Sequence, residues 1–157
     1  MSLSPQKITP FLWYGDNLAE EAATFYTSLF KDSHIISKTP VVVTFTLCGQ
    51  KFAALNGGQA YKFTPAISLL ISCEDQDEVD HFWNAFSKDG GAPVQCGWVT
   101  DKYGVSWQVV PRILPELLMD PDQEKAGRAK EAMLKMQKLD IAKLKAAHAG
   151  EGGSQKD

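Results

Sequence analysis

The sequence is poor in the features that mark secretion, membrane insertion and cysteine chemistry. Its three cysteines, Cys48, Cys73 and Cys96, are widely spaced and form no CxxC pair, so they predict neither a disulfide framework nor a cysteine metal site. No apolar run approaches the about 20 residues of a membrane-spanning helix. The first residues also lack the charged-then-apolar order of a signal peptide. We therefore expect a cytoplasmic protein with no membrane partner.

An excess of basic charge is also missing. The chain carries 16 basic and 19 acidic side chains, for a net charge of -3, and no basic stripe that would predict a nucleic-acid partner. The basic residues near the C-terminus are interleaved with acids, which is typical of a solvated helix face. With 157 residues, of which 44% are hydrophobic and 22% charged, the chain suits one globular domain with a sizeable core.

The chain contains the same order of predicted elements twice. A strand over 8–14 precedes a helix that we expect to begin at Asn17, because Asn17 and Glu20 have the capping-box spacing. A second apolar strand precedes a helix expected at Asp75, where Glu78 repeats that spacing. Three further strands follow each helix, at 34–37, 41–48 and 51–56 in the first half and at 94–96, 98–100 and 105–110 in the second. The pattern predicts a strand–helix–strand–strand–strand module, present twice.

The composition changes after Pro111 and predicts helices. Asp120, Pro121 and Gln123 have the pattern of a helix start, so we expect a helix from there to about Lys138. Asp140 is a second N-cap candidate and begins a short helix to Ala147. We therefore expect paired modules over 1–111 (about 5–60 and 61–111), a helical extension over 112–149 and a mobile tail over 150–157.

Four ordered blocks resemble one protein family. The blocks are Ile8–Phe30 (ITPFLWYGDNLAEEAATFYTSLF), Phe52–Gly58 (FAALNGG), Cys96–Pro111 (CGWVTDKYGVSWQVVP) and Ala132–Gly150 (AMLKMQKLDIAKLKAAHAG). They resemble the PhnB-like branch of the vicinal-oxygen-chelate superfamily, also called the demethylubiquinone-methyltransferase-like family. The resemblance implies an α+β fold in which paired βαβββ modules form a curved mixed sheet around a cavity, as in glyoxalase and bleomycin-resistance proteins. It also implies homodimers.

The resemblance also implies four strand positions where metal-dependent relatives place His, Glu or Gln. Here these positions hold Pro10 or Phe11, Asn56, Ser68 and Gln108. Neutral amides and a hydroxyl are poor ligands for a transition metal. The three histidines form no HxxxH or HxH pair. We therefore expect no metal and no other cofactor.

The replaced positions should still line the cavity. Asn56, Ser68 and Gln108 are its expected polar points, while catalytic residues cannot be assigned. Cys96 is a candidate nucleophile without an adjacent base, so packing in the pocket wall is the better interpretation. The expected ligand-binding set is Leu12, Asn56, Ser68, Leu70, Cys96, Trp98 and Gln108.

The leading functional hypothesis is a protein that binds a small, largely apolar, oxygen-containing molecule without metal, with any reaction unknown. The alternatives are a metal-dependent lyase, isomerase or dioxygenase of the glyoxalase type, the methyltransferase activity that the family name suggests, and a scaffold without a pocket. No glycine-rich nucleotide loop follows a predicted strand, so the residues do not themselves argue for methyl transfer.

Overall fold

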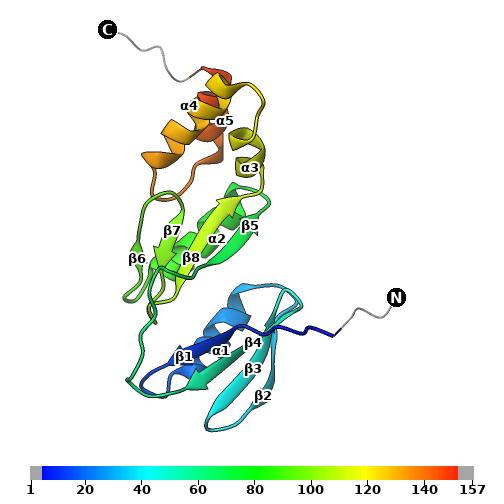
Figure 1. Ribbon diagram of the computed structural model, residues 1–157, viewed down its shortest axis with the longest axis vertical. Coiled ribbons are helices and arrows are strands. Elements are labelled where there is room, and N and C mark those ends of the chain that lie inside the picture. Colours follow the sequence, from blue (N-terminus) through cyan, green and yellow to red (C-terminus); the bar gives the residue numbers. More distant parts are fainter. Residues whose placement is uncertain (1–4, 152–157) are drawn as a thin grey trace. The chain divides into compact units, whose positions relative to one another are not determined.

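The computed structural model describes residues 5–151 and forms two compact units that divide between Phe63 and Thr64 (Figure 1). The first unit contains β1 (Phe11–Tyr14), α1 (Ala19–Leu29), β2 (His34–Lys38), β3 (Val42–Leu47) and β4 (Gln50–Asn56). The second contains β5 (Leu69–Cys73), α2 (Gln76–Ser87), β6 (Ala92–Pro93), β7 (Trp98–Thr100), β8 (Ser106–Pro111), α3 (Ile113–Leu118), α4 (Gln123–Leu134) and α5 (Ile141–Ala149).

Both units have the same sheet topology. The strand orders are β1-β4-β3-β2 and β5-β8-β7-β6. In each sheet the first strand pairs in parallel with the last strand of its module, and the other pairings are antiparallel. The chain between the two parallel strands of each module contains the helix and two further strands, and it is long enough for such a crossover. The predicted α+β fold with paired βαβββ modules and C-terminal helices is therefore confirmed.

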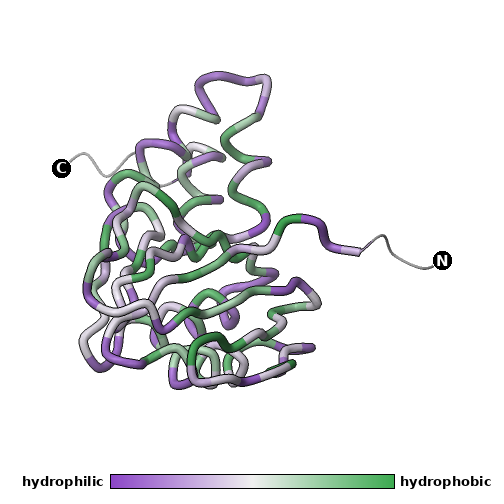
Figure 2. The backbone as a smooth tube through the Cα atoms, turned by 60° about the horizontal axis from the view of Figure 1, so that its bottom comes forward, coloured by the Kyte–Doolittle hydropathy of each residue, from purple (hydrophilic) through white to green (hydrophobic). Residues whose placement is uncertain are grey.

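In the first unit, α1 covers one face of the sheet. Residues alternate between the two faces along each strand, and the side chains of β3 are alternately buried and half-buried. Figure 2 shows the hydropathy of each residue along the backbone. Tyr14 and Tyr26 share a hydroxyl–hydroxyl hydrogen bond of 3.0 Å within this buried layer. Phe45 stacks on Phe52 with a centroid distance of 5.6 Å. These aromatic contacts make up much of the first core.

The start of α1 differs from the prediction. Asn17 has a φ of 56°, in the left-handed region, and helix α1 begins two residues later without a side-chain cap from the preceding residues. The amide N–H of Ala19 instead donates to Oδ1 of Asn56, at 2.9 Å. The predicted capping box at Asn17 is therefore wrong, because a residue distant in sequence supplies the missing acceptor.

The connection after β4 packs against β1. The indole Nε1 of Trp13 donates to the carbonyl oxygen of Gly58, at 2.9 Å. A Cβ atom on Gly57 would lie 2.2 Å from the Trp13 ring, a distance that no side chain tolerates. The ring of Tyr61 meets Trp13 edge-on at 4.9 Å. Glycine at position 57 is therefore a requirement of this packing.

The second unit confirms the predicted cap of its helix. The Asp75 carboxylate accepts a hydrogen bond from the Glu78 amide, at 2.9 Å, and the apolar stripe of α2 is buried. Trp107 of β8 stacks on Phe86 of α2 with centroids 4.5 Å apart. Its Nε1 donates to the buried Asp101 carboxylate, at 2.9 Å. Trp107 thus packs beneath α2.

The last strands and the helices after them are partly mispredicted. The segment 94–96 is not a strand; β6 ends at Pro93, and Cys96 has a left-handed φ of 59°. Helix α3 lies within the predicted helical extension, although the first individual helix there was expected only at Asp120. Pro115 lies in its first turn, where a missing amide hydrogen costs nothing.

Helix α4 begins two residues later than expected. Asp122, rather than Asp120, is its N-cap, and its carboxylate accepts from the amides of Glu124 and Lys125. Asp140 caps α5 as predicted. Leu139 and Leu144 are both fully buried, in a cluster formed by the C-terminal helices.

The predicted mobile tail falls mostly on 152–157, outside the described residues. Within 5–151, none of the helices has the length and apolar character needed to cross a membrane.

Candidate functional site

Each sheet has one face covered by its module helix and an opposite face, here named the distal face. In the second unit, Trp107 marks the side covered by α2, so its strand neighbours Ser106 and Gln108 point the other way. The strand register then identifies the other residues of this distal face. The distal face of the second unit is formed by Ser68, Leu70, Ser72, Trp98, Thr100, Ser106, Gln108 and Val110.

Four of the predicted site residues meet on this face. Leu70 on β5 and Trp98 on β7 both pair with Gln108 on β8. The Gln108 side chain donates from Nε2 to Oγ of Ser68, at 2.9 Å. Leu70 is 58% exposed, so this part of the distal face is accessible within its unit. The structure therefore brings together Ser68, Leu70, Trp98 and Gln108.

Leu12 and Asn56 lie on the face of the first sheet that α1 covers, and not on the distal face of that sheet. Tyr14 points towards α1, and Leu12, two residues earlier in β1, shares that side and is buried. Asn56 pairs with Tyr14 in the strand register. Its Oδ1 accepts from Ala19, at 2.9 Å, and its Nδ2 donates to the carbonyl oxygen of Pro40, at 3.0 Å. Both ends of the Asn56 amide are thus occupied within the first unit.

Cys96 lies next to the segment that connects α4 to α5. Its backbone amide donates to the carbonyl oxygen of Met136, at 2.8 Å, and the Gly97 amide donates to that of Gln137, also at 2.8 Å. Cys96 is half-buried. No base or cation pairs with its thiol among the described residues, so wall packing remains its predicted role.

The donor set at the family's metal positions does not fit a divalent transition metal. Pro10 has no side-chain atom that could bind a metal. The side chain of Asn56 already hydrogen-bonds Ala19 of α1 and the carbonyl oxygen of Pro40. Ser68 and Gln108 are neutral and bonded to each other. Within 5–151 there is also no group of three or more His, Cys, Asp or Glu side chains that could hold a metal. Carboxylate or imidazole ligands would be needed for tight binding.

The Ser68–Gln108 pair can both donate and accept. Because Gln108 uses Nε2 towards Ser68, its carbonyl Oε1 has no recorded partner among the described residues. The Ser68 hydroxyl accepts that bond, so its own hydrogen is available to a ligand. None of the distal-face residues carries a charge. The pair therefore matches a neutral group such as a hydroxyl better than an anion.

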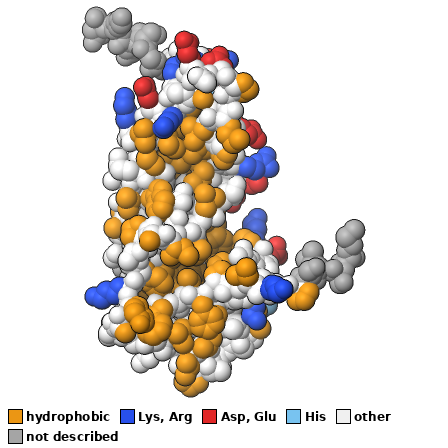
Figure 3. Space-filling view, viewed as in Figure 1, with side chains coloured by type: hydrophobic (Ala, Val, Ile, Leu, Met, Phe, Trp, Pro, Cys, Tyr) orange, Lys and Arg blue, Asp and Glu red, His pale blue; other side chains and the backbone are white. Residues whose placement is uncertain are grey.

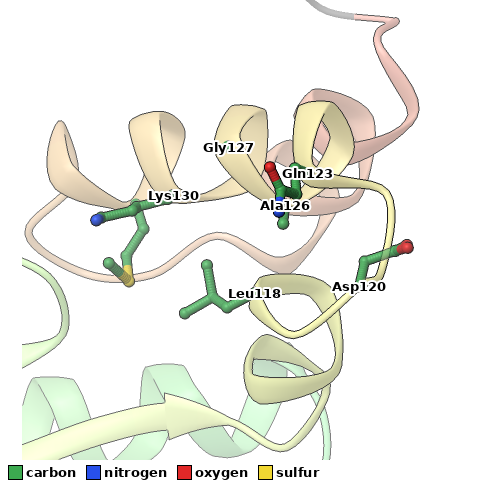
Figure 4. Close-up of a pocket in the computed structure, with 7 residues that line it drawn as sticks. Leu118, Asp120, Gln123, Ala126, Gly127 and Lys130 are labelled. Carbon is green, nitrogen blue, oxygen red and sulfur yellow. The ribbon is translucent and has the colours of Figure 1, made fainter.

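A hollow of about 440 Å³ lies between α3 and α4, away from the distal-face residues (Figure 4). Leu118 and Met133 form much of its apolar surface, and Lys130 extends along one side. Asp120 on its rim is ion-paired with His148, at 2.7 Å. The lining residues are Leu118, Asp120, Gln123, Ala126, Gly127, Lys130 and Met133. None of the predicted site residues is among them.

Sequence reasoning missed the residues that border the distal face at its C-terminal end. Val110 belongs to that face and is buried in the C-terminal cluster, against which Met136 packs. Strand alternation from Gln108 would have assigned Val110 to the distal face. No local signal could have placed Met136 against that cluster, because α3 and α4 separate it from Val110 in the chain. Figure 3 shows hydrophobic side chains over both the sheet of this unit and its C-terminal helices.

The chain matches one described family and several solved structures. The family described as 3-demethylubiquinone-9 3-methyltransferase matches residues 6–110. A putative protein of that description, a PhnB protein from Bacillus cereus, is 38% identical, with a TM-score of 0.62; the match covers 68% of this chain and 99% of that one. A sequence comparison with curated proteins finds no match.

Two more distant structures share the fold. A Pseudomonas aeruginosa protein is 18% identical over 65% of this chain and 94% of its own, with a TM-score of 0.51. The fosfomycin resistance protein of Listeria monocytogenes, solved with Mn(II) and sulfate, is 14% identical over 67% of this chain and 88% of its own, with a TM-score of 0.50. At such identities the likeness concerns the fold alone.

Proposed function

Because the chain belongs to the 3-demethylubiquinone-9 3-methyltransferase family, the PhnB-like branch of the glyoxalase and fosfomycin-resistance superfamily, we propose that it binds a small, largely apolar molecule carrying one or two oxygens. The binding surface is the distal face of the second unit. The polar contacts come from Ser68 and Gln108, and the apolar contacts from Leu70 and Trp98.

The observation that carries this proposal is the bond between Ser68 and Gln108 on an uncharged face. A ligand hydroxyl can donate to the Gln108 carbonyl oxygen and accept from the Ser68 hydroxyl. Each such bond contributes about 0.5–1.5 kcal/mol net. Burial against Leu70 and Trp98 would supply about 0.8 kcal/mol for each CH₂ group removed from water.

Methyl transfer, which the family description names, is not part of the proposal. A nucleotide-type methyl donor calls for a glycine-rich turn between a strand and a helix. The turn from β1 to α1 has the single glycine Gly15, and the turn from β5 to α2 has none. A metal-dependent glyoxalase-type reaction would need ligands that the donor set lacks.

The test is calorimetric titration with a primary alcohol and with its methyl ether, which cannot donate a hydrogen bond. We expect the alcohol to bind more tightly, and Gln108→Leu to weaken the alcohol about tenfold while changing the ether little. Asn56→Ala is the matched control, because that amide is committed to α1. Equal binding of alcohol and ether, or tighter binding of charged anions than of either, would contradict the proposal.

A further inference from the structure

We propose that the C-terminal helical extension sets the maximum length of the ligand, and that Met136 is the specificity-determining residue at the end of the site. This inference rests on the proposed site at Ser68 and Gln108. It concerns a part of the chain beyond the family match, which ends at residue 110.

The first step is the position of Val110. It lies two residues beyond Gln108 on the same strand and therefore on the same distal face. Unlike the exposed Leu70, Val110 is only 8% exposed, and it belongs to the buried cluster with Leu114, Leu117 and Leu139. The C-terminal helices therefore close the distal face at this end. In Figure 1 they lie beyond the carboxyl end of β8.

The second step is the rigidity of this closure. The segment between α4 and α5 is bound to the Cys96–Gly97 loop by two backbone hydrogen bonds of 2.8 Å. On its other side, the Gln76 side chain donates to the carbonyl oxygen of Leu139, at 3.1 Å, and accepts from the Ile141 amide, at 2.9 Å. Because hydrogen bonds hold this segment on two sides, we expect it to keep its position rather than to move aside for a longer ligand.

Met136 is the side chain that we place at this closed end of the distal face. Met136 packs against the cluster that contains Val110, and its carbonyl oxygen is bound to the amide of Cys96. Cys96 lies two residues before Trp98, the strand partner of Gln108. Two residues of strand span about 7 Å, which is the length available to an apolar chain between Gln108 and Val110. A ligand that places its hydroxyl at Gln108 therefore carries only a short apolar chain towards Val110.

The experiment measures the affinity of butanol, hexanol, octanol and decanol by calorimetry. For the unmodified protein, we expect affinity to rise roughly fourfold for each added CH₂ and to stop rising once the chain reaches Met136. Met136→Ala should move this limit to a longer alcohol, and Met136→Leu, which conserves volume, should leave it in place. Met133→Ala is the matched control, because Met133 packs on the same cluster but lines the hollow between α3 and α4.

The outcomes separate the two proposals. If no alcohol binds the unmodified protein, the proposed function fails and this inference fails with it. If alcohols bind, the inference is overturned by an affinity that rises without limit, or by a limit that stays in place in a folded Met136→Ala variant. It is also overturned if Met133→Ala moves the limit equally, because that result would indicate general loosening of the helices.

Discussion

At the scale of single residues, the side-chain amides of two strand residues, Asn56 and Gln108, differ in how many hydrogen bonds they form within their own unit. Asn56 has both ends bonded inside its own unit, whereas Gln108 has only its Nε2 engaged. The sequence does not distinguish them, because a shift of one residue in strand register moves a side chain to the other face. Gln108 lies beside Ser68 on the distal face, and whether the two residues bind a ligand stays a prediction.

Replacing Asn56 by Ala should destabilise the first unit. The change removes the acceptor for the first amide of α1 and the donor to Pro40, so we expect a loss of about 1–2 kcal/mol in the free energy of unfolding. Urea denaturation measures this loss. Asn17→Gly is the control and should be nearly neutral, since the φ of 56° suits glycine. A larger effect at Asn17 would show that Asn56 is not the effective cap.

Cys73 should be chemically inert in the folded protein. Burial, followed by the negative charge of Glu78, raises the pKa of its thiol to about 12, so the reactive thiolate is nearly absent at about pH 8. Iodoacetamide followed by mass spectrometry should label the exposed Cys48 and leave Cys73 unmodified until unfolding. Labelling of Cys73 at the rate of Cys48 would contradict this expectation.

The same shift of the Cys73 pKa predicts a pH dependence of stability. The unfolded thiol ionises near about 8.5, so above that pH the unfolded chain binds fewer protons than the folded one. The contribution of Cys73 to stability is therefore lost as pH rises from about 8.5 towards about 12. Urea denaturation should show a smaller decline over this range in Cys73→Ala than in the unmodified protein.

At the scale of elements, the sequence predicted those helix starts that depend on residues close together in the chain. The caps at Asp75 and Asp140 are local patterns, and both are confirmed. Two errors came from long-range contacts: α1 is capped from another strand, and the segment 94–96 leaves the sheet to bind the chain after α4. Such partners are set by the fold rather than by neighbouring residues.

Gln76 should determine how firmly α5 is held. Gln76→Ala removes the bonds to Leu139 and Ile141, and leaves two partly buried backbone groups without these partners. We expect hydrogen exchange to become faster over 136–149 and the unfolding free energy to fall by about 1–3 kcal/mol. Gln95→Ala, at an exposed position, is the control. Unchanged exchange over 136–149 would show that packing alone holds the helix.

At the scale of the whole molecule, the family match and the fold account for different parts of the chain. The match ends at residue 110, while α3, α4 and α5 follow within the second compact unit. The repeated order of elements was visible in the sequence because each module carries its own strand and helix signals. The packing of the extension on Val110 was not visible, since it depends on contacts between distant residues.

We predict that the protein is a homodimer. The first unit leaves large apolar side chains accessible, including Phe11 at 58% and Val41 at 56% exposure, and a second copy can cover such surfaces. Multi-angle light scattering at micromolar concentration should give twice the mass of one chain. A monomer under these conditions would refute the prediction.

The contact between Trp13 and Gly57 constrains how this sequence can change over evolutionary time. With the indole ring 2.2 Å from the place of any Cβ at position 57, the two positions cannot vary independently. A lineage that retains tryptophan at 13 must retain glycine at 57. One that replaces the tryptophan with a small side chain releases the glycine, so the pair should appear as a coupled substitution among descendants of a common ancestor.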